Sequence, residues 1–477
     1  MTFNSFTFIC IFPIIFILYW FVNSRKNIRK RFPAIGNILL LAISYTLYLK
    51  VEPAFVLILL WVTAVTFLAA KKIESDKAYG KKKYLIFTGV ILAVFPLLIF
   101  KYYNFISSQL NFIFNFCGID IGLPGLNWVI PIGLSFYTLQ AVGYLLDVYF
   151  TRIKAEHNWW SYMLFVSFFP QIASGPISKA IDLLPQINNK NRKFNYDQFV
   201  EGCRWLLWGM FLKVCVADRI GTIINPVLSN YMYNDGGSLI SSTLLYSFQI
   251  YSDFAGYSFM AMGTGKILGF DLINNFNRPY FSVSITDFWR RWHISLSTWL
   301  KDYIYIPLGG NRCSKLRNYF NIIVTFLVSG IWHGANWTYI IWGVFHGIAQ
   351  VVEKFLGLNK RKSNYVVSSF RIIFTFCLVS IFWIFFRMPS ITDACQYITC
   401  MLRGNSTIDF GLIINNKTLL IPLYMLVIKD FIDEFAPKFS LFHNKYTIIR
   451  WSNYILLTSM ILLFGVFDAS QFIYISF

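Results

Sequence analysis

The chain has 477 residues, of which 56% are hydrophobic, 19% aromatic and only 13% charged, and its mean hydropathy is +0.54. Soluble domains are about 45–50% apolar with about a quarter of their residues charged, so this composition excludes an ordinary soluble protein. Apolar stretches long enough to cross a bilayer recur along the whole length, which predicts an all-α polytopic membrane protein. The net charge of +20 comes from basic residues in short loops, a distribution typical of cytoplasmic loops facing anionic lipid and not of a nucleic-acid groove.

The eight cysteines do not predict a disulfide framework. Most of them lie in or beside apolar stretches, and no pair has C-x-x-C spacing. We interpret them as small buried hydrophobic residues. We expect no metal ion and no tightly bound cofactor.

The N-terminal part alternates predicted spans with basic loops. The first span covers residues 6–22, and because no basic residue precedes it and no small-residue cleavage site follows it, we interpret it as retained. Spans at 34–49 and 53–70 form a hairpin, and a fourth span covers 84–100. Dense basic loops follow the first and third spans, which the positive-inside rule places in the cytoplasm. The N-terminus is therefore expected outside, and counting spans onward places the C-terminus outside as well.

The middle of the chain contains apolar stretches with polar residues that would face lipid poorly. The segment 131–140 has a proline and a glycine followed by hydroxyl and amide side chains, which predicts a helix packed inside the protein. The segment 169–176 is too broken for a span and predicts a re-entrant or interfacial piece. The apolar run 239–270 is expected to be interrupted at 251–257, where Asp253 is not expected to face lipid.

Three further spans are predicted near residues 370–386, 418–427 and 454–467. No internal repeat or second domain is found, so the whole chain is expected to form one integral-membrane domain. Its predicted parts are N-terminal spans (1–128), a core with the histidine-bearing segments (129–350) and C-terminal spans (351–477).

A polar stretch, residues 287–347, holds three of the five histidines: His293, His333 and His346. A histidine in apolar membrane sequence is costly to bury, which makes it a functional-site hypothesis. His346 follows His333 by 13 residues, and on one regular helix it would point roughly 220° away. We therefore expect His346 to contact another helix and not to share a reaction with His333.

The neighbours of His333 predict its chemistry. Gly334 has no side chain and would let another backbone or a thin ligand approach. Asn336 could hold an imidazole tautomer or an amide carbonyl, and Trp332 and Trp337 offer large walls with one N–H each. This set suits a general base that removes a proton from a hydroxyl while an acyl chain approaches. The alternative is a hydrogen-bonded packing histidine.

His293 follows a segment that carries both acidic and basic residues. Asp287 is three residues before Arg290 and four before Arg291, so an intrahelical ion pair is available. The segment is either an amphipathic interfacial helix or the carrier of a second polar group near the active site. The later basic residues could receive the phosphates of a cytosolic nucleotide-bearing donor, although basic residues after a membrane segment usually only mark topology. These basic residues are Lys301, Arg312, Lys315 and Arg317.

Several stretches of the chain resemble the membrane-bound O-acyltransferase (MBOAT) family, most of all its bacterial AlgI-like branch of alginate and peptidoglycan O-acetylation proteins, and more distantly DltB of teichoic-acid D-alanylation. The matching stretches are residues 131–147, 170–176, 275–280, 287–311, 329–337, 341–343 and 472–474. The resemblance implies a ring of tilted helices with re-entrant pieces around a thinned centre. It also implies that His333 is the family's buried histidine and His293 its second, upstream polar position.

What the resemblance implies for function is acyl transfer, most simply of an acetyl group, in the bacterial inner membrane. The donor would be a cytosolic thioester, acetyl-CoA or an acyl-carrier protein. The acceptor path would lead through a partner of the SGNH acetyltransferase type outside the cytoplasm to an exported polysaccharide. Further residues are candidates for positioning the donor or the substrate: Gln140, Asp253, Arg290, Arg291, Trp332, Asn336 and Trp337.

Two alternatives remain open at this point. The first keeps the family and changes the acceptor to a teichoic acid or a lipid hydroxyl. The second is a proton-coupled transporter, in which Asp253, His333 and the broken helix at 131–133 would form an ion pathway. No inverted repeat supports the transporter.

Overall fold

The computed structural model describes residues 3–32, 34–50, 53–189, 191–358, 364–403, 411–442 and 444–467. Helices and connecting loops make up all of this described part of the chain, without a β-strand, which confirms the all-α prediction. The predicted basic residues Lys360, Arg361 and Lys362 and the ending 472–474 lie outside the described residues.

The N-terminal helices follow the predicted spans closely. They are α1 (Phe6–Ser24), α2 (Lys26–Arg31), α3 (Ile35–Leu49), α4 (Pro53–Ser75), α5 (Tyr79–Leu97), the π-helical turn η1 (Leu98–Tyr102) and α6 (Tyr103–Phe116). The first basic loop is itself the short helix α2, in keeping with the good helix propensity of lysine and arginine.

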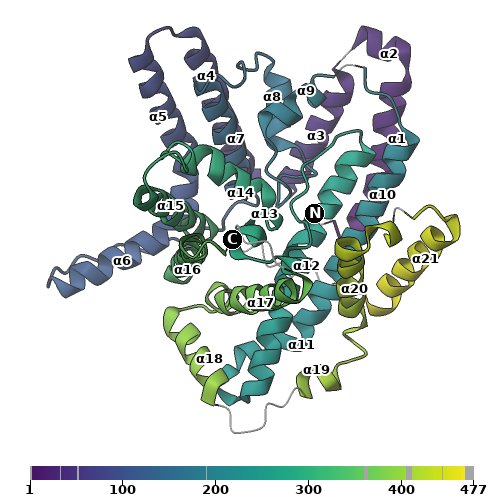
Figure 1. Cartoon of the computed structure of the whole chain (residues 1–477). Coiled ribbons are helices and arrows are strands. Elements are labelled where there is room, and N and C mark those ends of the chain that lie inside the picture. The colour runs from purple at the N-terminus through teal and green to yellow at the C-terminus, as the bar shows by residue number, and fades with distance from the viewer. Residues whose placement is uncertain are drawn as a thin grey trace.

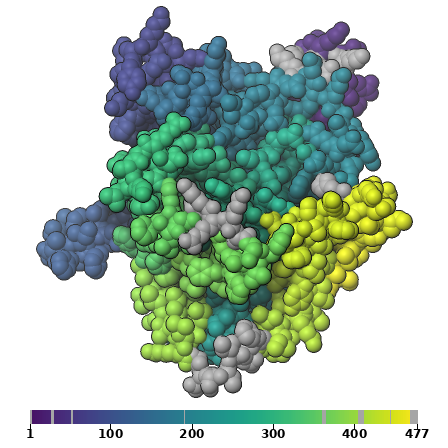
Figure 2. All heavy atoms as spheres, viewed as in Figure 1, coloured from purple at the N-terminus to yellow at the C-terminus, as the bar shows by residue number. Residues whose placement is uncertain are grey.

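The prediction of the fourth span was wrong at its end. A loop was expected after residue 100, but the chain stays helical through η1 and α6 as far as Phe116. Beyond η1 the helix α6 leaves the body of the protein and projects outward (Figures 1 and 2). It exposes the apolar side chains of Phe112 and Phe116. This amphipathic pattern of apolar and amide residues is what allows the helix to continue past the span.

The core helices carry the segments singled out in the sequence. They are α7 (Leu134–Tyr149), α8 (Trp159–Ser167), α9 (Ala180–Ile187), α10 (Tyr196–Met210), the π-helical η2 (Phe211–Ala217), α11 (Asp218–Ser229), α12 (Gly236–Ile267), α13 (Ile285–Arg291), α14 (Ile294–Leu300), α15 (Lys315–His333) and α16 (Trp337–Phe355). The C-terminal helices are α17 (Tyr365–Arg387), α18 (Ile391–Arg403), α19 (Gly411–Asn415), α20 (Ile421–Phe435) and α21 (Thr447–Phe464).

The start of α7 explains the glycine of segment 131–140. Gly133 has a positive φ of 74°, and a Cβ on it would lie 2.0 Å from the carbonyl oxygen of Ile172. Only glycine allows the irregular segment between α8 and α9 to pack this closely against the N-terminus of α7. The broken stretch 169–176 is therefore a loop buried against α7, as its composition indicated.

Helix α12 crosses the centre of the molecule without the predicted interruption at 251–257. Within this stretch Tyr251 and Asp253 are buried and bind side chains of neighbouring helices, so the backbone has no need to break for them. Asp253 shows this: its carboxylate accepts a hydrogen bond from Lys213 Nζ at 2.7 Å, and Lys213 also binds Asp218 at 2.6 Å. A buried ammonium between two carboxylates offsets part of the cost of removing these charges from water.

Helices α10 and α12 pack through two pairs of glycines. A Cβ on Gly209 would lie 2.5 Å from the Gly256 carbonyl oxygen, and one on Gly202 would lie 2.8 Å from that of Gly263. The two backbones therefore touch, as small residues permit in membrane helices. This contact fixes the central helix α12 against the rest of the core.

Five helices of the described residues are long and apolar enough to cross a membrane. They are Phe6–Ser24, Pro53–Ser75, Tyr79–Phe116, Tyr365–Arg387 and Thr447–Phe464. The core helices between them carry more polar residues and are the more buried part of the protein. The molecule is thus an integral membrane protein with apolar helices around a polar centre.

The glycine contact predicts a stability effect. Gly209→Ala would drive a methyl group into the Gly256 carbonyl and should destabilise the protein by about 1–3 kcal/mol, the usual cost of overpacking. Thermal unfolding of the purified protein in detergent, at one fixed heating rate, should show a lower Tm. Gly80→Ala is the matched control, because nothing lies within 4 Å of its added methyl group. Equal Tm values for the two variants would contradict the proposed close contact.

Candidate functional site

His333 is the last residue of α15 and is almost completely buried, with 1% of its surface exposed. Helices α15 and α16 form a hairpin that packs through small residues. A Cβ on Gly343 would lie 2.4 Å from the Phe326 carbonyl oxygen, and one on Gly334 would lie 2.2 Å from the Tyr339 ring. The space expected beside Gly334 for a second backbone or a ligand is therefore filled by this tyrosine ring.

One hydrogen bond determines which ring nitrogen of His333 carries a proton. Its Nδ1 lies 2.7 Å from the carbonyl oxygen of Ser329, one turn earlier on the same helix. A carbonyl can only accept, so Nδ1 carries the proton and Nε2 carries the lone pair. Nε2 is buried and has no partner among the described residues. The histidine is thus held as a neutral base with one nitrogen available.

His293 lies beside it in an unusual backbone conformation. It precedes α14 with φ 42° and ψ 54°, in the left-handed region, and its side chain is fully buried. For a non-glycine residue this conformation costs about 1–2 kcal/mol. Asn275 holds the next two residues, accepting from Ile294 N at 3.0 Å through its carbonyl and from Ser295 N at 3.1 Å through its side chain. Strain of this kind is concentrated at functional sites.

The two imidazoles are brought together from segments 40 residues apart in sequence. Their ring centroids are 6.5 Å apart. Trp332 contacts both, at 4.9 Å from the His333 ring and 5.9 Å from the His293 ring. Phe254 of α12 packs at 4.6 Å on His293. Neither ring nitrogen of His293 has a hydrogen-bond partner in the described part of the protein. Aromatic rings thus surround the two imidazoles, an arrangement called the chamber below, and three of the four imidazole nitrogens have no protein partner among the described residues.

The third histidine, His346, lies next to this chamber and is connected to it through Trp342. The prediction for His346 assumed one continuous helix, but α15 ends at His333 and α16 begins at Trp337. The His346 Nδ1 accepts from Trp289 Nε1 of α13 at 3.2 Å. Trp342 contacts both His333 and His346, at 4.8 Å and 5.0 Å. His346 thus contacts another helix as expected, and one tryptophan connects it to the site.

Two residues of η1 were not recognised in the sequence. Lys101 Nζ donates to the Trp332 carbonyl at 2.6 Å, and Tyr102 Oη donates to the Ile331 carbonyl at 2.7 Å. They satisfy carbonyls that the end of α15 leaves without helical partners. Lys101 ends an apolar run, so in the sequence it resembled an ordinary topology signal.

Two residues beside His333 in sequence do not join it in space. Asn336 caps α16 instead of holding the imidazole: its Oδ1 accepts from Thr338 N at 3.1 Å and its Nδ2 donates to the Pro389 carbonyl at 2.7 Å. Trp337 is 47% exposed and donates to Gln109 Oε1 of α6 at 3.1 Å. The extended backbone between α15 and α16 turns both side chains away from the chamber.

The other polar candidates have structural partners. Gln140 donates to the Phe165 carbonyl at 2.5 Å and accepts from Gln171 at 3.0 Å, which ties α7 to the buried loop. Arg291 makes the predicted intrahelical ion pair with Asp287, at 3.1 Å. It also makes an ion pair between helices, with Glu434 of α20, at 2.9 Å. The carboxylate of Asp253 is turned to Lys213. These contacts hold the helices in place around the chamber.

Arg290 is exposed at the surface of α13. Its neighbour Trp289 points inward to His346, whereas Arg290 lies about 100° further around this short helix. The structure therefore does not place Arg290 in the chamber.

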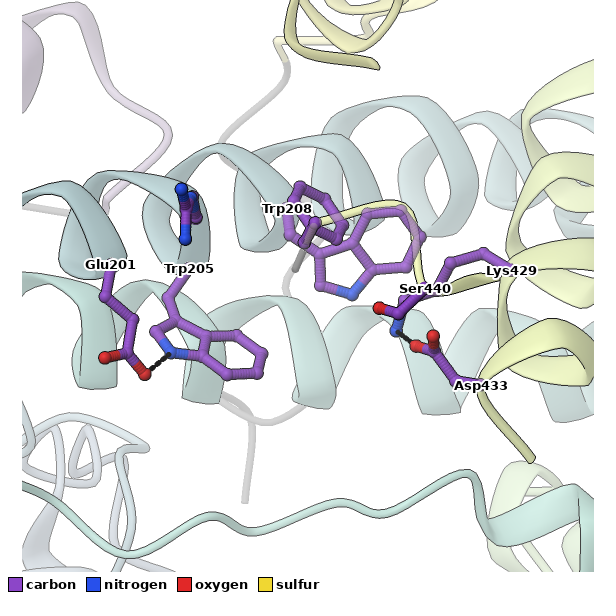
Figure 3. A pocket seen from close by; sticks show the side chains of 8 residues that line it. Glu201, Trp205, Trp208, Lys429, Asp433 and Ser440 are labelled. Atoms are coloured by element: carbon purple, nitrogen blue, oxygen red, sulfur yellow. Dashed lines mark hydrogen bonds and ion pairs between the residues drawn. The ribbon is translucent and has the colours of Figure 1, made fainter. Parts of the chain in front are cut away.

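A pocket of about 50 Å³ lies away from the histidines, between α10 and α20 (Figure 3). Its charged side chains are paired with one another or with close neighbours. Lys429 binds Asp433 at 3.0 Å, and Trp205 Nε1 donates to Glu201 at 3.4 Å. Arg204 donates to Tyr454 Oη at 2.6 Å. The pocket thus offers no unpaired group for chemistry. Elsewhere in the described chain, no three His, Cys, Asp or Glu side chains cluster in a way that could hold a metal ion.

Comparison with known proteins agrees with this geometry. Residues 47–392 match the model of the membrane-bound O-acyltransferase family. The chain is 38% identical over 397 residues to the "Probable alginate O-acetylase AlgI" of Pseudomonas aeruginosa, covering 83% of this chain and 73% of that protein. It is 32% identical to the "Peptidoglycan O-acetyltransferase" of Helicobacter pylori, covering 85% and 80%. It is 27% identical to the "Teichoic acid D-alanyltransferase" of Bacillus subtilis, covering 76% and 92%. The chain belongs to the membrane-bound O-acyltransferase family and is an O-acyltransferase.

Proposed function

We propose that the protein transfers an acetyl group from a cytosolic thioester across the membrane for the O-acetylation of an exported polysaccharide. The names of its more similar relatives, which describe alginate and peptidoglycan O-acetylation, support this acceptor class. The observation that carries the chemistry is the buried His333, whose Nδ1 is bound to the Ser329 carbonyl while Nε2 has no protein partner among the described residues.

In this proposal His333 is the general base. Its Nε2 takes the proton of the attacking hydroxyl while the hydroxyl oxygen adds to the thioester carbonyl. The tetrahedral intermediate then collapses, the C–S bond breaks, and the imidazolium returns the proton to the departing thiolate. A positioned acid–base group of this kind contributes about 10²–10⁴-fold in rate. The aromatic walls from Trp332 and Trp342 exclude water, which would otherwise hydrolyse the thioester.

His293 is assigned the role of polarising or positioning the thioester. With centroids 6.5 Å apart, the two imidazoles can contact one small acyl group from two sides. A neutral imidazole has one N–H, and neither nitrogen of His293 has a partner in the described residues. Its N–H can therefore donate to the thioester carbonyl, where negative charge develops during the reaction.

We further propose a membrane orientation in the bacterial inner membrane. The basic loops lie in the cytoplasm, both termini lie outside, and the donor, acetyl-CoA or an acyl-carrier thioester, arrives from the cytoplasm. Lys301, Arg312 and Lys315 are exposed and offer charges for donor phosphates. An SGNH-type acetyltransferase outside the cytoplasm would receive the acetyl group and complete its transfer to the polysaccharide.

The acceptor is tested in cells. Deleting the gene should remove ester-linked acetate from the exported polysaccharide, and re-expressing the intact protein should restore it. Mild alkali followed by acetate quantification measures the esters. Loss of ester-linked D-alanine from teichoic acid, with polysaccharide acetate unchanged, would overturn the acceptor and favour the D-alanylation branch.

The role of His333 is tested in the purified protein with its acceptor partner. His333→Ala should lower the release of free CoA from acetyl-CoA by about 10²–10⁴-fold, because the base is lost. His157→Ala is the matched control, since this histidine has an exposed side chain and pairs with Glu74 at the surface. It should retain wild-type turnover. Equal CoA release by His333→Ala and wild type would remove His333 from the mechanism.

The role of His293 can be separated from its backbone strain. Asparagine and glycine both tolerate the left-handed conformation, so neither substitution adds backbone strain. His293→Asn should fold with a small loss of Tm, whereas His293→Gly also empties the space of a buried ring and should lower Tm further. Both lack the imidazole and should lower kcat by about 100-fold, as expected for one lost polarising donor. If either folded variant kept the wild-type kcat, His293 would be a structural residue only.

A further inference from the structure

Lys101 is a buried cation without a nearby acidic partner. Its side chain is 7% exposed. In the described part of the protein its Nζ binds only neutral oxygens, the Trp332 carbonyl at 2.6 Å and the Ser135 hydroxyl at 3.3 Å. The other buried lysine of the described residues, Lys213, is paired with two carboxylates. An unpaired ammonium at membrane depth is costly, and such residues are usually functional.

The partner of Lys101 is the peptide group that joins Trp332 to His333. This carbonyl belongs to the last turn of α15, at the negative end of the helix dipole, where a cation is favoured. The contact joins η1 to α15 across 231 residues of sequence. It therefore fixes the backbone directly preceding the base.

The π-helical form of η1 serves this contact. Single π-helical turns inside α-helices are rare overall, and those that occur are often found at functional sites. Here one such turn separates α5 from α6 and carries both Lys101 and Tyr102, which bind two successive carbonyls at the end of α15. Ser135, near the start of α7, holds Lys101 from its other side. Three separate segments thus converge on the lysine.

We propose that Lys101 is a positioning residue for the acyl transfer, whose ammonium holds the Trp332 carbonyl and thereby orients the His333 imidazole. This inference rests on the proposed role of His333 as the base. Lys101 acts through the backbone of α15 and has no assigned contact with the donor. Misplacing a catalytic group by about 1 Å can lower the rate about 10²-fold, so the loss of this contact should be visible in kcat.

The test compares three substitutions in the purified protein with its acceptor partner and acetyl-CoA. Lys101→Met removes the ammonium at similar length and should lower kcat about 10- to 100-fold, with KM for acetyl-CoA within about twofold. Lys101→Arg keeps a charged donor and should restore kcat to within about fivefold of wild type. Lys101→Gln keeps a donor without charge and is measured in place of Lys101→Met if that variant does not fold. Lys81→Met, at an exposed position of α5, is the matched control and should match wild type.

A double-mutant comparison separates positioning from general stability. In a His333→Ala background, Lys101→Met should cause no further loss of the residual turnover, because the group that it positions is already absent. A further loss there, or a wild-type kcat in Lys101→Met alone, would overturn the proposal. If His333→Ala itself retained full activity, the proposed function of His333 would fail first, so the two failures are distinguishable.

Discussion

The requirement that polar groups inside a membrane find partners within the protein governs the end of helix α15. A helix leaves its last carbonyls without helical partners, and in lipid no water can replace them. Here the carbonyls of Ile331 and Trp332 accept from Tyr102 and Lys101 of a distant helix, while the Ser329 carbonyl accepts from the His333 imidazole. The contacts that satisfy the helix end therefore lie next to the imidazole that we propose as the base.

The polar candidates differ in how they meet this requirement: some bind protein partners, and others have none among the described residues. Asp253, Gln140 and Arg291 are buried or half-buried and bind protein partners. His333 Nε2 and both nitrogens of His293 are buried without partners among the described residues. Leaving such groups unsatisfied costs about 1–3 kcal/mol each, and the left-handed backbone of His293 adds to that cost. The two neighbouring histidines thus offer three unsatisfied nitrogens to a polar reacting group.

Sequence reasoning located the long apolar helices, because an apolar stretch of sufficient length identifies a membrane helix directly. It was wrong where polar residues were taken to break a helix, at 251–257 of α12, and where a span was taken to end, after residue 100. Tertiary contacts decided the first case, because Asp253 and Tyr251 of α12 find partners on η2 and α20. In the second case the amphipathic sequence of α6 keeps the chain helical beyond the span.

For the site, the sequence by itself determined the class of protein and singled out His293 and His333 as candidates, because an imidazole in membrane-like sequence is rare. It did not determine which neighbours assist them. Asn336 and Trp337 are adjacent to His333 in sequence yet point elsewhere, whereas Lys101 is 232 residues away and binds the peptide group next to it. The sequence shows which residues are neighbours along the chain. The hydrogen-bond partners at a helix end come from whichever helix packs against it, and only the tertiary structure decides which helix that is.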